Sequence, residues 1–204
     1  MNEDARWLVT AVAALVATAG LGAYVSHRAL TPLDEASIRL RGHGIRLAVL
    51  FTRSGYWPAL TCLAVVLGGV ELIVRGGILY ALTLSATQLL SQYVSDVAKA
   101  HAKRIRPADW LFRHEGGFSF PSGHATTAVV FFGGLMLFVW NLPLPAGLHI
   151  AVSVVAALFI VGIPWSRMAL SAHFATDVLG GLLFGGAWLC IMVAVLVHLH
   201  MVTS

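Results

Sequence analysis

His173 and Asp177 are the pair of residues in this sequence with the clearest capacity for chemistry. They lie four positions apart, so on a helix both side chains would share one face within hydrogen-bonding reach. A carboxylate beside one ring nitrogen fixes the tautomer of a histidine and leaves the other nitrogen free to act as a nucleophile. Arg167, six positions before the histidine, offers a planar guanidinium that matches the oxygens of a phosphate. The alternative for this cluster is a purely structural ion pair.

A second cluster, Pro121-Ser122-Gly123-His124, combines a helix start with a histidine. Proline suits the first positions of a helix, and glycine lets a bulky ligand approach the backbone. The unpaired N–H groups of the first turn, together with the Ser122 hydroxyl, would bind an anion. His124 would then lie within one turn of that anion. The alternative is a simple helix cap with an interfacial histidine.

A third cluster is basic and runs from Lys99 to Pro107. Lys99, Lys103 and Arg106 are separated by three, four and seven positions, so they would share one face of a helix. Pro107 disfavours continuation of that helix beyond Arg106. Alone, such a run is typical of a segment that anchors a helix at an interface. Its spacing indicates a function only when it is considered together with the other two clusters.

The elements that must position these clusters are apolar. Of the 204 residues, 58% are hydrophobic and 11% are charged, and the mean hydropathy is +0.84. Soluble domains carry about a quarter charged residues, so the composition indicates a polytopic membrane protein. The net charge of +4 comes from basic residues between apolar segments, which favours anionic lipid headgroups over nucleic acid as partners. Cys62 and Cys190 lie inside apolar segments and predict neither a disulfide nor a metal site.

Six apolar runs are long enough to cross a bilayer. Each has roughly 17–21 residues, which at about 1.5 Å per residue spans a hydrocarbon core of about 30 Å. They predict an all-α fold in which residues 1–204 form a single membrane-embedded domain with six transmembrane helices. We expect the first run to be retained, because its leader lacks the positive charge of a signal peptide. The predicted spans are Trp7–Val25, Tyr56–Val74, Gly77–Val94, Thr126–Leu142, Leu148–Trp165 and Val178–His198.

Because successive spans alternate in direction, three polar connections fall on one face of the membrane. They cover residues 26–55, 95–122 and 166–177, and the three clusters lie within them or extend at most two residues beyond. In the first of them, Thr31 and Pro32 predict the start of a helix. The arginines that follow, within residues 39–46, belong either to a solvated connector or to an amphipathic segment beside lipid phosphates.

Together, the three clusters resemble the signature of the type 2 phosphatidic acid phosphatase superfamily, which also includes vanadium haloperoxidases. That signature is a lysine, six residues and Arg-Pro; then Pro-Ser-Gly-His; then Ser-Arg, five residues, a histidine, three residues and an aspartate. Every position is matched in order, and the six-span layout extends the resemblance over essentially the whole chain. The segment from His114 to Phe120 also resembles bacterial lipid phosphatases. The matching residues are Lys99, Arg106, Pro107, Pro121, Ser122, Gly123, His124, Ser166, Arg167, His173 and Asp177.

The resemblance implies a helical phosphatase core and a role for each residue, in agreement with the chemistry drawn from the residues alone. His173, oriented by Asp177, would attack phosphorus and form a phosphohistidine. His124 would protonate the leaving oxygen, which typically contributes about 10²–10⁴-fold, and would then activate water. The groups that would hold the phosphoryl oxygens are Lys99, Arg106, Ser122, Gly123 and Arg167.

Neither a metal nor another cofactor is expected. Only Asp109, Glu115 and Asp177 among the nine acids lie near the clusters, and they form no carboxylate pair suited to magnesium. Three cations can neutralise the developing charge instead. His114 and Glu115 are weaker candidates for contact with the substrate headgroup, and the alternative for both is a polar loop near the membrane.

The predicted function is hydrolysis of a terminal phosphate from a lipid phosphate or diphosphate. Undecaprenyl diphosphate, phosphatidylglycerophosphate, phosphatidic acid and lipid A phosphate all fit. The main alternative is a lipid phosphotransferase that uses the same histidine with an acceptor other than water. A haloperoxidase is disfavoured because the oxidase members of the fold are soluble, and a transporter because the spans carry almost no charge inside. Membrane lipids are expected partners, and no oligomeric state is predicted.

The resemblance places the protein in a bacterial inner membrane, with the site facing the periplasm and both termini in the cytoplasm. The distribution of positive charge indicates the reverse, because among thirteen lysines and arginines only Arg6 and Arg75 lie on the side away from the clusters. We follow the resemblance. The basic residues near the clusters have a second reason to be there, the binding of lipid phosphates.

Overall fold

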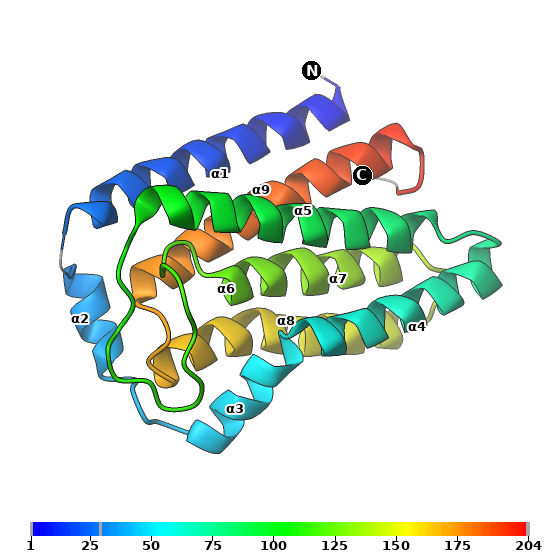
Figure 1. The fold of residues 1–204 in the computed structure, drawn as a ribbon. Helices are drawn as coiled ribbons and strands as arrows, with labels where there is room; N and C mark the ends of the chain where they lie inside the picture. Colours follow the sequence, from blue (N-terminus) through cyan, green and yellow to red (C-terminus); the bar gives the residue numbers. More distant parts are fainter. Residues whose placement is uncertain (1, 29, 203–204) are drawn as a thin grey trace.

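Helices form every regular element in the part of the chain that the computed structural model describes, residues 2–28 and 30–202. Six long helical segments pack into a bundle (Figure 1), which confirms the predicted all-α fold. They are α1 (Glu3–Ser26), α4 (Trp57–Arg75), α5 (Leu79–Ala102), the continuous segment α6–η1–α7 (Gly123–Trp140), α8 (Ala146–Ala169) and α9 (Ala175–His198). Two short helices, α2 (Pro32–Ile38) and α3 (Ile45–Ser54), lie at one end of the bundle.

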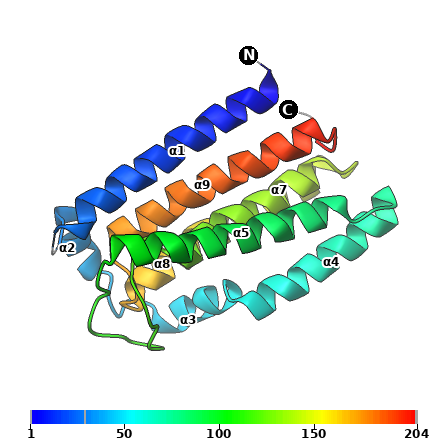
Figure 2. The same ribbon diagram turned by 45° about the horizontal axis from the view of Figure 1, so that its top comes forward.

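Five of the described helices are long and apolar enough to cross a membrane: α1, α4, the segment Gly123–Trp140, α8 and α9. The remaining predicted span, Gly77–Val94, corresponds to α5, which is as long as α1 but does not reach that hydropathy. Polar side chains in its middle, Gln88 and Gln92 among them, are the reason. α5 nevertheless runs alongside α4 and α9 (Figure 2). The sixth span therefore stays a prediction.

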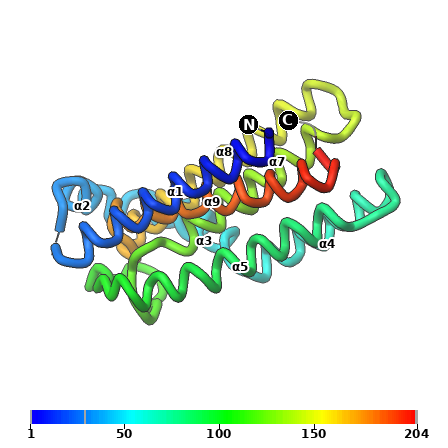
Figure 3. The backbone as a smooth tube through the Cα atoms, turned by 90° about the horizontal axis from the view of Figure 1, so that it is seen from above, coloured from blue at the N-terminus to red at the C-terminus, as the bar shows by residue number. Residues whose placement is uncertain are grey.

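The segment Gly123–Trp140 and α9 form the middle of the bundle. In their most apolar stretches, 56% and 50% of the residues are buried, against 17% in α4 and in α8. On α4, Val65 and Ile73 are 69% and 86% exposed. Large apolar surface of this kind is unfavourable in water but not in hydrocarbon, so the outer faces suit a lipid environment. α1 packs along α9, and the start of α1 and the end of α9 lie at the same end of the bundle (Figure 3).

The fourth long segment starts at Gly123, earlier than the predicted Thr126, because Ser122 caps it. The cap is weak, since the Ser122 hydroxyl accepts from the N–H of Ala125 at 3.5 Å. After α6 (Gly123–Thr127) the segment passes through a π-helical turn, η1 (Ala128–Phe132), and becomes α-helical again in α7 (Gly133–Trp140). A π-helical turn holds one residue more than an α-helical turn.

Glycines let α9 approach the start of α6. A Cβ atom at Gly181 would lie 2.4 Å from the carbonyl oxygen of Ser122, and one at Gly185 would lie 2.8 Å from that of Thr126. Only glycine leaves room for backbones this close. The Ser122 N–H also donates to the carbonyl of Asp177 at 2.9 Å. The elements that carry the second and third clusters are thereby held together.

Gly181→Ala is expected to lower the thermal unfolding temperature of the protein in detergent. The added Cβ meets a backbone oxygen that cannot rotate away, and overpacking of this kind costs about 1–3 kcal/mol. Gly186→Ala, on the same helix, is the matched control, because a Cβ there has no atom within 4 Å. Equal unfolding temperatures for the two variants would show that the close approach is not required.

The first polar connection starts as predicted. α2 begins with a capping box in which the side chains of Thr31 and Asp34 each bind the backbone N–H of the other residue. α2 contacts α9, and α3 packs against α8. The two helices of this connection are therefore packed on the bundle, whereas residues 39–47, which contain three arginines, are exposed except for the half-buried Leu40.

Candidate active site

The three clusters meet at one end of the bundle, as the alternation of spans predicts. Loop 103–122, the link between α8 and α9, and the short helices α2 and α3 all lie there (Figure 1). Lys99, Arg106, His124 and His173 line one cavity, although they come from three different segments of the sequence.

His173 does not lie on a helix, which corrects the expectation that it shares a helical face with Asp177. α8 ends at Ala169 and α9 begins at Ala175, so His173 lies in the link between them. The two residues still meet, because Oδ2 of Asp177 accepts from the Phe174 N–H at 2.9 Å and holds the link over the first turn of α9. The distance from His173 Nδ1 to the same Oδ2 is 3.6 Å, short enough for electrostatic orientation but too long for a hydrogen bond.

The second ring nitrogen of His173 faces a cation. Nε2 lies 2.9 Å from Nη1 of Arg106. A guanidinium can only donate, so in this contact Nε2 is the unprotonated nitrogen, and Nδ1 carries the hydrogen toward Asp177. Burial first, and then the positive charges of Arg106 and Arg167, hold the pKa of His173 well below that of free imidazole. His173 is therefore neutral at physiological pH, and the lone pair of Nε2 accepts from Arg106; it becomes available to a ligand only when Arg106 moves.

Arg106 reaches the site from a loop, which corrects a second expectation. α5 ends at Ala102 because Lys103 adopts a left-handed conformation with φ 49°, so Lys99, Lys103 and Arg106 share no helical face. Lys103 is exposed, whereas Arg106 donates to the carbonyls of Gly117 and Ala172, both at 3.2 Å. Burial lowers the pKa of Arg106, but a guanidinium remains charged at physiological pH.

Lys99 lies across the cavity, close to the start of α6. A Cβ atom at Gly123 would lie 3.5 Å from Lys99 Nζ and 3.0 Å from Oε1 of Gln92, so a larger residue would crowd this approach. Nζ is also paired with the exposed carboxylate of Asp96 at 2.7 Å. Lys99 and Gly123 thus border one end of the cavity, whereas Ser122 is fully buried and is not among the residues that line it.

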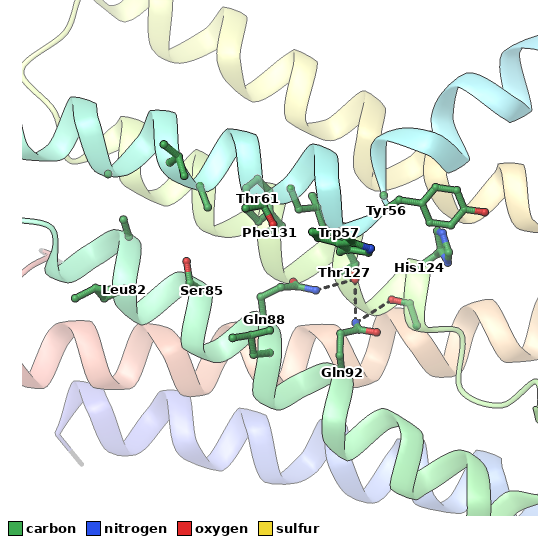
Figure 4. A pocket seen from close by; sticks show the side chains of 18 of the residues that line it. Tyr56, Trp57, Thr61, Leu82, Ser85, Gln88, Gln92, His124, Thr127 and Phe131 are labelled. Carbon is green, nitrogen blue, oxygen red and sulfur yellow. Dashed lines mark hydrogen bonds between the residues drawn. The ribbon is translucent and has the colours of Figure 1, made fainter.

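His124 projects into the same cavity from α6 (Figure 4). The ring of Tyr56 lies edge-on to it, with 5.0 Å between the centroids. His124 Nε2 and the Tyr56 hydroxyl are both buried, and neither has a hydrogen-bond partner among the described residues. Unpaired buried polar atoms are rare in proteins, and two beside one cavity indicate a ligand there.

Arg167 is 1% exposed and is held by Glu115 and Thr52, to both of which its guanidinium donates. Glu115 also lies 3.5 Å from Arg106. Burial acts to raise the pKa of Glu115, but the charge and hydrogen bond of Arg167, together with the charge of Arg106, outweigh it and hold that pKa below its usual range. A carboxylate therefore stands between two cations expected to hold phosphate. His114 is not brought to the site, since it is exposed and stacks on Trp110 with 4.5 Å between the centroids.

Sequence reasoning missed a buried ionic network behind the histidine. Arg104 donates to Asp34 at 2.6 Å and to Asp177 at 2.7 Å, and all three side chains are at most 4% exposed. Thr176 and Ser119 complete it, with hydroxyls that contact Asp34 at 2.7 Å and Asp177 at 3.3 Å. Arg104 lies in a run of basic residues, and nothing in the run singles it out. The helix-capping pattern at Thr31 draws attention to Asp34 in the sequence, but it does not indicate that the Asp34 side chain is buried.

The cavity at this end has a volume of about 810 Å³ and continues between α4 and α5. Its polar end is formed by both histidines, Lys99, Arg106 and Glu115. Beyond them, the walls are mostly apolar. The residues of this apolar part, which we call the groove, include Trp57, Leu60, Ala64, Val65, Leu72, Ile78, Leu82, Leu89 and Phe131. A cavity of this shape suits a ligand with an anionic head and a hydrocarbon tail.

Known proteins resemble this chain in sequence and in fold. Residues 80–200 match the family model described as the PAP2 superfamily. Phosphatidylglycerophosphatase B of Bacillus subtilis (strain 168) is 36% identical over 110 residues, which are 53% of this chain and 52% of that protein. The match thus spans about half the length of the relative.

A solved structure resembles the whole bundle. It is described as the crystal structure of the first transmembrane PAP2 type phosphatidylglycerolphosphate phosphatase from Bacillus subtilis, with a TM-score of 0.78 and 25% identity. The superposition covers 90% of this chain and 94% of that chain. With the family match extending over more than half of its residues, the chain is a multi-span membrane protein that belongs to the PAP2 superfamily.

Proposed function

We propose that this protein is a lipid phosphatase that removes a terminal phosphate from a lipid phosphate or diphosphate through a phosphohistidine. The observation that carries the proposal is the placement of His173 Nε2 beside Arg106, at the polar end of an otherwise apolar cavity. A nucleophile, cations and a hydrocarbon-lined groove together suit a phosphate on a lipid anchor. The name of the Bacillus subtilis relative supports phosphatidylglycerophosphate as one substrate, and undecaprenyl diphosphate remains a second candidate.

The proposed reaction has two steps. In the first, Nε2 of His173 forms a bond to phosphorus while the bond to the leaving oxygen breaks, and His124 donates a proton to that oxygen. In the second, His124 takes a proton from water, the water oxygen attacks phosphorus, and the phosphorus–nitrogen bond breaks. Lys99, Arg106 and Arg167 would neutralise the phosphoryl oxygens in both steps. Asp177 would stabilise the positive charge that forms on His173.

Arg167 can take part only if Glu115 gives way, because its guanidinium donates to that carboxylate. The incoming phosphate would replace the Glu115 carboxylate between Arg106 and Arg167. Glu115 would then lie near the leaving group, which agrees with its predicted role beside the substrate headgroup.

Activity is expected to survive EDTA and to be inhibited by orthovanadate. The cations already balance the phosphoryl charge, and the described residues hold no group of three or more histidine, cysteine or acidic side chains placed to bind a metal ion. Five-coordinate vanadate on His173 resembles the transition state, which the site should bind more tightly than substrate. Phosphate release from phosphatidic acid micelles measures both effects. Loss of activity in EDTA that magnesium restores would overturn the proposed role of the cations.

We propose that the site faces the periplasm of a bacterial inner membrane. The basic residues that argue against this orientation are in part accounted for, since Lys99, Arg104, Arg106 and Arg167 all lie at the site or in the network behind it. They are therefore weak reporters of topology.

A cysteine at Gly116 in an otherwise cysteine-free protein should react with an impermeant maleimide in intact spheroplasts. Gly116 is exposed, and a side chain there has no atom within 4 Å. Gly77→Cys is the matched control, because an added Cβ there likewise has no atom within 4 Å and the residue lies in the turn between α4 and α5 at the opposite end of the bundle. Labelling of Gly116→Cys only after lysis, with Gly77→Cys labelled in intact cells, would establish the reverse orientation.

A further inference from the structure

A row of polar side chains crosses the groove beyond the histidines. It consists of Thr61 on α4, Ser85, Gln88 and Gln92 on α5, and Thr127 on α6, and we call it the polar row. Figure 4 shows Gln88 and Gln92 both directed at Thr127. A lipid-filled groove has no need of such groups, since burying polar side chains in an apolar setting is unfavourable unless they are hydrogen-bonded.

The two glutamines are only partly satisfied by the protein. Nε2 of Gln92 donates to the Gly123 carbonyl at 3.2 Å and to the Thr127 hydroxyl at 2.9 Å. Nε2 of Gln88 donates to the same hydroxyl at 2.8 Å. Oε1 of Gln88, at the other end of its amide, is buried and has no partner among the described residues. The unpaired oxygen of Gln88 can accept only from a donor such as a ligand hydroxyl, whereas the second N–H of its Nε2, beyond the one given to Thr127, can donate to an ester or phosphodiester oxygen.

The polar row lies at a fixed distance from the reacting groups. Thr127 follows His124 by three residues on α6, which places it about 4.5 Å farther along the helix axis. His124 is the proposed donor to the leaving oxygen. The polar row therefore faces the atoms of the leaving group that are a few bonds removed from that oxygen.

Lipid phosphates differ in these atoms. In a glycerol-based lipid, oxygen atoms lie within a few bonds of the leaving oxygen: ester oxygens in phosphatidic acid, and a hydroxyl and a phosphodiester in phosphatidylglycerophosphate. In a polyprenyl diphosphate, the leaving oxygen is bonded to the inner phosphate, which the cations at the polar end would bind, and beyond that phosphate only hydrocarbon follows. We infer that the polar row is a binding subsite for a glycerol linkage and makes the enzyme prefer glycerol-based lipid phosphates over polyprenyl diphosphates. This inference rests on the proposed phosphatase function.

A structural tether is the competing explanation, because side-chain hydrogen bonds between helices can hold a membrane bundle together. The two explanations differ in what they predict. A tether would affect every substrate alike and would lower the stability of the fold. A subsite would affect glycerol-based substrates selectively.

The test compares kcat/KM for phosphatidylglycerophosphate, phosphatidic acid and undecaprenyl diphosphate in the same mixed micelles. Gln88→Met keeps the length of the side chain and removes the amide. We expect it to lower kcat/KM for the glycerol-based lipids about tenfold, the effect of one lost hydrogen bond, and to leave that for undecaprenyl diphosphate unchanged. Ser85→Ala should act in the same direction and provides a second variant if Gln88→Met does not fold. Thr83→Val is the matched control, because its hydroxyl binds the Leu79 carbonyl of its own helix and lies outside the groove.

A dialkyl ether analogue of phosphatidic acid identifies the oxygen that is bound. If Gln88→Met no longer matters for the ether, the ester carbonyls are the contact. If it matters only for phosphatidylglycerophosphate, the contact is the headgroup glycerol. Equal losses for all lipids, or an unchanged preference, would overturn the subsite while leaving the phosphatase function intact. A wild-type protein that releases phosphate from none of the lipids would contradict the proposed function itself.

Discussion

His173→Ala is expected to reduce phosphate release from any lipid phosphate by at least about 10⁴-fold, since it removes the proposed nucleophile rather than a group that assists it. His124→Ala should behave differently. It removes the proton donor and the base, so a substrate with a good leaving group should still phosphorylate the enzyme once, and the phosphoenzyme should then accumulate. Rapid quenching with ³²P-labelled substrate measures this, because phosphohistidine is stable in alkali and labile in acid.

His149→Ala is the matched control for this experiment. His149 is half-buried and contacts the Leu142 carbonyl at 3.2 Å, but it lies at the opposite end of the bundle from His173. The control should retain the activity of the wild-type protein. If His173→Ala keeps a tenth of that activity, or if its phosphoenzyme still forms, the covalent mechanism is wrong.

Arg104→Met is expected to destabilise the fold by about 3–5 kcal/mol and to impair catalysis together with it, because it leaves Asp34 and Asp177 buried without their shared cation. Arg41→Met is the matched control. It breaks the pair with Asp109, whose side chains are 37% and 65% exposed, and should cost no more than about 1 kcal/mol. Denaturation in detergent and phosphate release measure the two effects.

The destabilisation by Arg104→Met should depend on pH. Burial acts to raise the pKa of Asp34, but hydrogen bonds from Thr176, Thr31 and Arg104 outweigh it, so the folded-state pKa lies below the ordinary value. A lowered pKa contributes stability above the ordinary aspartate range, near about 3.9, and that contribution is lost as the pH falls through the folded-state pKa. The loss in free energy of unfolding caused by Arg104→Met should therefore be largest at neutral pH and smaller in acid. A deficit that does not change with pH, or one no larger than that of Arg41→Met, would argue against the network.

The sequence predicts the broad architecture because hydropathy acts over whole segments. A run of about twenty apolar residues has few alternatives to a membrane-spanning helix. Five of the six predicted runs correspond to described helices that are long and apolar enough to cross a membrane. α5 departs from the pattern because a helix that lines a functional groove carries polar residues such as Gln88 and Gln92.

The motifs indicate the candidate site residues, several of which line one cavity, but the geometry of these residues could not be derived from spacing. The four-residue interval of His173 and Asp177 suggests a helical face, yet a carboxylate that caps the next helix gives the same proximity in a different way. Arg106 likewise arrives from a loop, because the left-handed conformation of Lys103 ends the helix early. The partnership of Arg104 with Asp34, seventy positions away, depends on tertiary packing and has no local signal.

The π-helical turn η1 divides the central helix into two segments with different angular settings. Successive residues of an α-helix are rotated by about 100°, and one additional residue in a turn offsets everything beyond it by a similar angle. His124 and Thr127, before the turn, can therefore point toward the cavity. Beyond the turn, the Gly134 carbonyl accepts a hydrogen bond from the Tyr80 hydroxyl at 2.7 Å. Deleting one residue within Ala128–Phe132 would rotate one segment relative to the other. An engineered chimera that takes His124, the proposed proton donor, from this helix must also take the π-helical turn, because otherwise the segments before and after the turn would be rotated relative to each other.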